Sequence, residues 1–157
     1  FTPAEDIKGF STKVGDEMPK EIKEGMIEFE TGPLPLAVLE PIFNTLPIDI
    51  TFVDPEDNVR YFSKGEERIF VRTKAVIGRS VQNCHPHKSI HVVNKILSDF
   101  REGKRKVAEF WIQLGERKIH IRYFAVHSKE GKYLGCLEVS QDITEIQKLE
   151  GQKRLLD

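Results

Sequence analysis

Three consecutive segments late in the chain alternate apolar and polar residues, and this pattern restricts the possible folds more than any other feature. The segments cover residues 108–114, 118–126 and 133–143, and they are separated by Gly115-Glu116 and by residues 128–131. Alternation over such lengths is typical of half-buried β-strands, and short Gly-containing connections are typical of hairpins. The sequence therefore predicts a three-stranded antiparallel meander.

The alternation also assigns each side chain to a face of this meander. We expect the core-facing residues to be Ala108, Phe110, Ile112, Leu114, Ile119, Ile121, Tyr123, Ala125, Leu137, Val139 and Ile143. The opposite, outer face is then expected to carry Trp111, Phe124 and Cys136. Because the core-facing side is strongly apolar, helices must cover it.

A helix suited to this task is predicted at residues 89–101. Ser89 is a good N-cap residue, and Val93, Ile96, Leu97 and Phe100 recur at helical spacing. We expect the last three of these side chains to share one core with the meander.

The segments upstream are shorter. Residues 48–53 and 59–62 read as two strands of a hairpin joined by a tight polar turn at 54–58. Ser63, with Glu66 three residues later, has the spacing of a capping box and predicts a further helix.

The flanking regions complete the predicted organisation. Residues 1–33 are expected to form a linker or peripheral segment, in which 26–30 alternates like a short strand. Residues 34–47 are expected to form a flanking helix with Pro41 inside it, residues 48–144 the main domain, and residues 145–157 an exit helix.

Composition excludes several classes of function. The chain has 157 residues, a net charge of −1 and 39% hydrophobic residues, which suits one core and gives no electrostatic footprint for nucleic acid. No apolar run reaches the roughly 18–20 residues that span a bilayer. Two cysteines far apart favour a reducing, cytoplasmic location. Since the sequence begins with Phe1 rather than Met, we expect a fragment whose upstream domain is a possible partner.

The order of elements over residues 48–144 resembles the PAS domain. Three motifs carry the resemblance: Phe52-Val53-Asp54 ending the first strand, Val76-Ile77-Gly78-Arg79, and Asp142-Ile143-Thr144 closing the last strand. The resemblance implies an α+β fold, a five-stranded antiparallel sheet with helices packed on one face, plus an N-terminal helical or extended segment.

A closer resemblance lies in residues 46–54, in Tyr61-Phe62-Ser63 and in Asn83-Cys84-His85-Pro86. These segments are similar to the C-terminal PAS module of bacterial and archaeal proteins that carry a hemerythrin-like domain. The resemblance implies a sensory role, often with dimerisation through a helix ahead of the first strand.

The strongest chemical motif is Cys84-His85-Pro86-His87, with His91 nearby. A thiolate and imidazoles at this spacing are candidate metal ligands, and we name Cys84, His85 and His87. The alternative is a helix-entry turn whose imidazoles bind carbonyl groups or water. A haem ligand is the related option, for which His85, His87 and His127 are candidates, whereas the helical stripe places His91 on the solvent side.

Asp49 stands inside a strong strand pattern, and a buried carboxylate there needs a partner. We expect it near Cys84 and His85. The full set of expected ligand-binding residues is Asp49, Cys84, His85, Phe110, Tyr123 and His127.

Three functions remain open at this point. The first is a non-enzymatic sensory module that binds a small molecule in its core cavity, associates with other proteins, or does both. The second is a haem- or metal-binding redox or gas sensor that uses residues 84–91. The third is a small enzyme with Asp49 and His85 as an acid/base pair, although no phosphate loop, nucleophile elbow or metalloprotease helix is present.

Association is expected as well. Trp111 and Phe124 on the outer face require a cover, which the helix at 34–46 and a second copy of the chain would supply. The sequence therefore predicts a homodimer.

Overall fold

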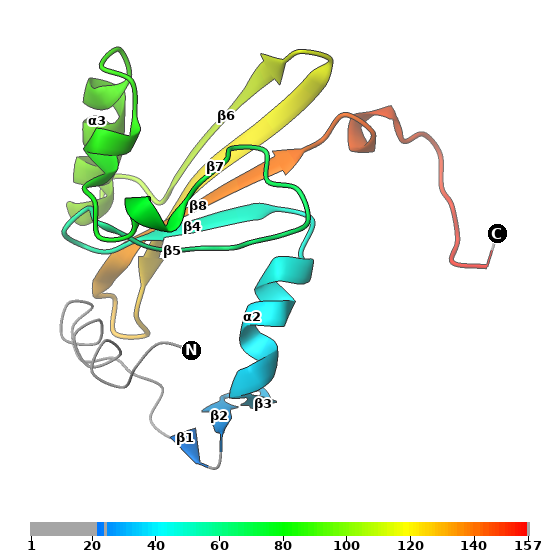
Figure 1. Ribbon diagram of the computed structural model, residues 1–157, viewed down its shortest axis with the longest axis horizontal. Helices are drawn as coiled ribbons and strands as arrows, with labels where there is room; N and C mark the ends of the chain where they lie inside the picture. The colour runs from blue at the N-terminus through cyan, green and yellow to red at the C-terminus, as the bar shows by residue number, and fades with distance from the viewer. Residues whose placement is uncertain (1–21, 24, 157) are drawn as a thin grey trace.

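The computed structural model describes residues 22, 23 and 25–156, and the segment 1–21 lies outside the described residues. A five-stranded antiparallel sheet dominates the structure, with strand order β5-β4-β8-β7-β6 (Figure 1). Its strands are β4 (Asp49–Val53), β5 (Val59–Phe62), β6 (Val107–Leu114), β7 (Arg117–His127) and β8 (Tyr133–Asp142). The predicted sheet, the hairpin and the meander are all confirmed.

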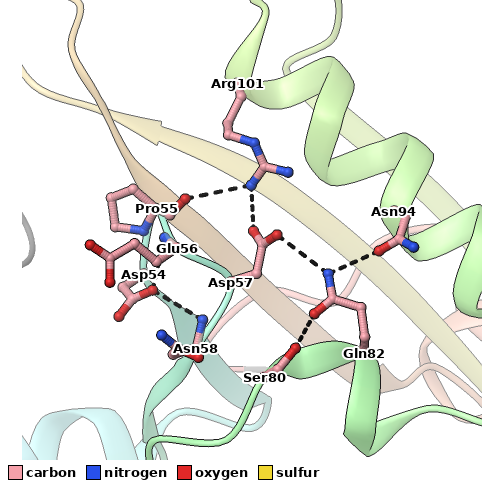
Figure 2. A network of polar contacts seen from close by, with 9 residues as sticks. All are labelled: Asp54, Pro55, Glu56, Asp57, Asn58, Ser80, Gln82, Asn94 and Arg101. Atoms are coloured by element: carbon pink, nitrogen blue, oxygen red, sulfur yellow. Dashed lines mark hydrogen bonds and ion pairs between the residues drawn. The ribbon is translucent and has the colours of Figure 1, made fainter.

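The hairpins follow from local chemistry. The β6–β7 pair runs without a break from Val107↔Phe124 to Leu114↔Arg117, and Gly115, at φ 63°, supplies the left-handed backbone of the connecting turn. In the β4–β5 turn, the fully buried Asp54 accepts the backbone N–H groups of Glu56 and Asn58 (Figure 2).

Helix α3 (Ile90–Arg101) packs on one face of the sheet, which we call the inner face. Ile96, Leu97 and Phe100 are buried there, as predicted. The remaining buried members of this core are Val53, Val59, Val81, Ala108 and Cys136. Figure 1 shows α3 beside the sheet at the end of β6 that is farther from the β6–β7 turn.

The predicted face of β8 is wrong. The register aligns Val53, Cys136 and Ala125 across three strands on the inner face, and Leu137 is opposite Phe52 and Phe124 on the outer face. Leu137 and Val139 therefore lie away from α3, and Cys136 lies beneath it. The alternation was misleading because β8 buries residues on both faces: Cys136 on the inner face and Val139 on the outer face.

The helix predicted at Ser63 is not formed. Ser63 instead extends the β4–β5 pairing: its N–H donates to the Ile50 carbonyl, and its hydroxyl accepts the Ile50 N–H at 2.9 Å. The connection to α3 contains only two short 3-10 turns, η1 (Lys74–Val76) and η2 (Val81–Cys84). The Ser63 hydroxyl bonds to Ile50 of the neighbouring strand instead of capping a local helix.

The N-terminal elements form a separate small sheet, β1 (Ile22–Lys23), β2 (Met26–Phe29) and β3 (Gly32–Pro35), followed by α2 (Leu36–Thr45). The predicted strand near 26–30 is confirmed, and the helix begins two residues later than predicted because Leu34 and Pro35 pair with β2. The Phe43 ring lies 5.9 Å from Tyr61 of β5. Tyr61 pairs with Phe52, so α2 contacts the outer face.

The predicted exit helix is reduced to one 3-10 turn, η3 (Ile146–Lys148), within the described residues. Leu149, Leu155 and Leu156 are almost fully exposed. Because short helices are marginal without packing, these leucines do not sustain a helix here. No helix in the described part of the chain is long and apolar enough to cross a membrane.

Candidate functional site

A small cavity lies between the inner face and the η2–α3 segment. Its volume is about 20 Å³, enough for a water molecule but not for an organic ligand. The strands contribute the base, and η2, His85 and α3 contribute the other wall. The lining residues are Val53, Val81, His85, Val93, Ile96, Leu97, Tyr123, Cys136 and Glu138.

His85 is held in a defined tautomer at the edge of this cavity. Its Nδ1 lies 2.9 Å from the carbonyl oxygen of Val81. Since a carbonyl only accepts, Nδ1 is the donor, and in the neutral ring Nε2 is then the acceptor. The imidazole therefore offers one acceptor nitrogen to a ligand.

Tyr123 and Glu138 form the polar part of the base. Burial raises the pKa of the Tyr123 hydroxyl, and its contact with the Glu138 carboxylate raises it further. The guanidinium of Arg72 lies 3.5 Å from Glu138, and both side chains are largely buried. The Nε of Arg72 has no hydrogen-bond partner among the described residues. A buried ion pair with a spare donor thus stands beside an apolar cavity.

Cys136 contributes a neutral wall rather than a reactive group. Burial raises the pKa of its thiol, and the nearby carboxylate of Glu138 acts in the same direction. The thiol is therefore protonated near neutral pH and suits apolar contact more than thiolate chemistry.

Asp49 lies outside this cavity. Its carboxylate accepts the backbone N–H of Ile69 at 2.7 Å and holds the loop after β5 against the sheet. Asp49 lines a separate open groove of about 600 Å³ between the end of α2 and that loop. The structure therefore does not bring Asp49 and His85 together as an acid/base pair.

The other expected residues are scattered. Cys84 packs against the core with its Sγ 3.8 Å from the Ser80 carbonyl, and His87 is exposed. The exposed His127 lies edge-on to Tyr133 at 5.8 Å, and Phe110 lies 5.6 Å from Tyr123. Of the expected ligand-binding residues, His85 and Tyr123 line the cavity.

Metal and haem binding meet different obstacles. Across residues 22, 23 and 25–156, no group of three or more His, Cys, Asp or Glu side chains could hold a metal ion. A cavity of about 20 Å³ does not fit a haem. The residues present therefore do not form a ready site for either group.

The sequence did not indicate Arg72, Glu138 or Cys136 as site residues. The alternation assigned Glu138 and Cys136 to the outer face, away from the cavity, because it reversed the two faces of β8. Arg72 comes from an irregular loop, where no periodicity indicates direction. The one available signal was an acidic residue between Leu137 and Val139 in the strand.

An antiparallel sheet of this strand order, with one long helix on its inner face and a small cavity between them, makes this an α+β domain. A family model described as PAS domain matches residues 39–144, more than half of the chain. The chain belongs to the PAS domain family.

Solved structures agree with this assignment. A C-terminal domain from Streptococcus mutans is 32% identical, with a TM-score of 0.75, over 80% of this chain and 97% of that one. The PAS domain of a protein from Colwellia psychrerythraea is 18% identical, with a TM-score of 0.51, over 70% and 98%. No curated protein matches the chain.

Proposed function

We propose that this chain is a sensory signal-transduction module without catalytic activity, and that it binds a small molecule in the cavity under α3. The observation that carries the proposal is a buried polar group: Tyr123 and Glu138 line the cavity, and Arg72, which does not line it, pairs with Glu138 at 3.5 Å. Burying an ion pair is costly, and the unmatched Nε–H of Arg72 adds to that cost. A polar group of a ligand near this cluster would offset part of it.

The cavity must widen to admit such a ligand. Its base belongs to hydrogen-bonded strands, whereas its other wall is the η2–α3 segment with Val81, His85 and Val93. We propose that this segment moves outward on binding. Arg101 and Gln82 link the same segment to the β4–β5 turn, so the displacement would reach the edge of the sheet.

Two matched substitutions test ligand binding. Val93→Phe fills the cavity, whereas Val92→Phe adds the same bulk at an exposed neighbour on α3. Native mass spectrometry of the purified proteins would detect a co-purifying molecule, and NMR would detect phenol added as a small probe. We expect binding in the wild type and in Val92→Phe, and loss in Val93→Phe. Absence of both signals from the wild type would refute the ligand-binding role.

A haem-based gas or redox sensor is the second candidate, because His85 lines the cavity and uses Nδ1, not Nε2, for its contact with the Val81 carbonyl. It requires a much larger displacement of α3 than a small ligand does. An absorption spectrum of the protein after haem addition tests it. A Soret band shift that disappears in His85→Ala would favour this candidate, and no shift would eliminate it.

We further propose a cytoplasmic module that acts beside a hemerythrin-like domain of the same polypeptide. The support is the resemblance of residues 46–54, 61–63 and 83–86, together with two unpaired cysteines. The iron content of the full-length polypeptide is the test, since a hemerythrin-like domain would bring iron, which no group of side chains among the described residues could hold. An iron-free full-length protein would remove this proposal.

We also propose that the module works as a homodimer. Large apolar side chains remain exposed after α2 has covered part of the outer face, among them Trp111, Val107, Val38 and Ile42. Light scattering of the wild-type chain at tens of micromolar tests this. A monomer under these conditions would contradict it.

A further inference from the structure

Strand β6 is an open edge of the main sheet. It pairs with β7 on one side, and no strand of the described residues pairs with its other side. The Ala125 N–H donates to the Lys106 carbonyl, which identifies Lys106↔Ala125 as a hydrogen-bonded pair. Hydrogen-bonded pairs alternate along an antiparallel ladder. Residues 108, 110, 112 and 114 therefore point their backbone groups at β7, and residues 107, 109, 111 and 113 point theirs outward.

The opposite edge, β5, is protected in ways that β6 is not. β5 has four residues, a register shift against its partner β4, a charged Arg60, and the Phe43 ring of α2 packed on Tyr61. β6 has eight residues in uninterrupted register, without proline or lysine. Natural sheets usually blunt a long edge with such devices. The absence of these protective features from β6 indicates that this edge is available to pair with another strand.

Side chains on both faces of β6 agree with this interpretation. Trp111 is 61% exposed on the outer face, and Phe110 and Ile112 are 37% and 36% exposed on the inner face. Figure 1 shows why: the β6–β7 hairpin extends away from α3, and no helix of the described residues lies beside its tip.

We propose that β6 pairs antiparallel with β6 of a second copy and joins the two sheets into one. The inference rests on the proposed homodimer and assigns its interface. One register stands out, with Phe110 opposite the partner's Phe110 on the two-fold axis. It matches residue 107 with 113 and residue 109 with 111, and so pairs all four outward-facing residues of each strand. Shifting the register by two residues either way leaves one of the four unpaired.

Charge favours the same register. Glu109 is the only charged residue of β6, and it would lie opposite the partner's Trp111. A shift by two residues in one direction would place Glu109 against the partner's Glu109, which is unfavourable. Just beyond the strand ends, the favoured register brings Lys104 toward the partner's Glu116 at both ends of the interface.

A cysteine at the two-fold axis tests the register. Opposed residues of a non-hydrogen-bonded pair have Cα atoms about 4.5 Å apart, within disulfide range. Phe110→Cys should therefore form a disulfide-linked dimer under mild oxidation. Ile112→Cys is the matched control: it has the same face and nearly the same exposure, but its partner copy would lie about 13 Å along the strand. The wild type controls for the native thiols of Cys84 and Cys136.

Charge substitution provides a second test that needs no oxidation. Trp111→Glu would place two acidic pairs across the interface with Glu109, whereas Trp111→Lys would place two acid–base pairs. Both variants lose the same exposed aromatic ring. We expect the dimer dissociation constant of Trp111→Glu to be about tenfold larger than that of Trp111→Lys. The melting temperatures of the dissociated chains should be equal.

The outcomes separate the two proposals. A monomeric wild type overturns both the homodimer and its β6 interface. A dimer in which Phe110→Cys and Ile112→Cys crosslink equally, or in which the two Trp111 variants associate equally, overturns the β6 interface and leaves the homodimer standing. Selective crosslinking of Phe110→Cys, together with weaker association of Trp111→Glu than of Trp111→Lys, supports the β6 interface.

Discussion

Arg101, in the last turn of α3, donates a 2.6 Å hydrogen bond to the carboxylate of Asp57 in the β4–β5 turn (Figure 2). Asp57 has a left-handed backbone, with φ at 69°, and its other oxygen accepts from Gln82 at 3.3 Å. Gln82 also donates to Asn94 of α3 at 2.9 Å and bonds the Ser80 hydroxyl. The network ties the helix over the cavity to the β4–β5 turn.

The first prediction concerns this pair. Arg101→Met should lower the free energy of unfolding by about 1 kcal/mol, since Arg101 is partly exposed and the pair is partly screened. Asp57→Asn keeps a residue that tolerates the left-handed backbone and removes only the charge. Urea melts of both single variants and the double variant give the coupling energy. Additive effects would show that the pair contributes nothing to stability.

The second prediction separates two phenylalanines that the sequence treated alike. Phe100 is fully buried and Phe110 is 37% exposed. Phe100→Ala should cost about 3–5 kcal/mol through lost burial and a residual cavity. Phe110→Ala should cost about 1 kcal/mol in the monomer. Urea melts measure both losses of unfolding free energy. A similar loss for the two variants would mean that the β6 tip is covered in solution at the concentration used.

The third prediction concerns Gly135, whose φ is 141°. A Cβ at this position would lie 2.2 Å from the backbone oxygen of Val53 and 2.9 Å from the Phe52 ring. Gly135→Ala should therefore destabilise the chain by about 2–5 kcal/mol. Gly131→Ala is the control, because it shares a positive φ but has open space around its Cβ, and should cost about 1 kcal/mol. Equal melting temperatures for the two variants would contradict the close approach.

The fourth prediction is a pH dependence at Asp99. The hydrogen bond from Lys95 lowers the pKa of the Asp99 carboxyl below its ordinary value of 3.8, and the charges of Lys95 and Arg105 act in the same direction, while burial opposes them. The folded chain thus binds this proton less readily than the unfolded chain. The resulting stability is present above pH 3.8 and is lost as the pH falls through the lower, folded value.

Asp99→Asn removes this titration. The gap in unfolding free energy between wild type and variant should be constant from neutral pH to about pH 4 and should narrow below it. Urea melts across this range measure the gap. Two parallel curves down to about pH 2 would show that Asp99 does not carry the effect.

Local patterns were enough for much of the fold. Gly115-Glu116 and the alternation around it predicted the β6–β7 hairpin, and the polar turn after Val53 predicted β4–β5. Ile96, Leu97 and Phe100 were correctly assigned to the core because a helical stripe needs only neighbours four residues away. Of the expected ligand-binding residues, His85 and Tyr123 line the cavity; the first was indicated by a motif and the second by the alternation of its strand.

The sequence by itself determined the strands of the main sheet, the turns between β4 and β5 and between β6 and β7, and the helix that covers them, because these depend on interactions between near neighbours. Only the tertiary structure decided which side chains of β8 face the core. That strand is central, and either Leu137 and Val139 or Cys136 and Glu138 could face the core. Which pair does so depends on the register of β8 with β4, more than eighty residues away in sequence. The buried pair of Arg72 and Glu138 follows from that choice, since a loop without periodicity finds its partner only once the sheet is assembled.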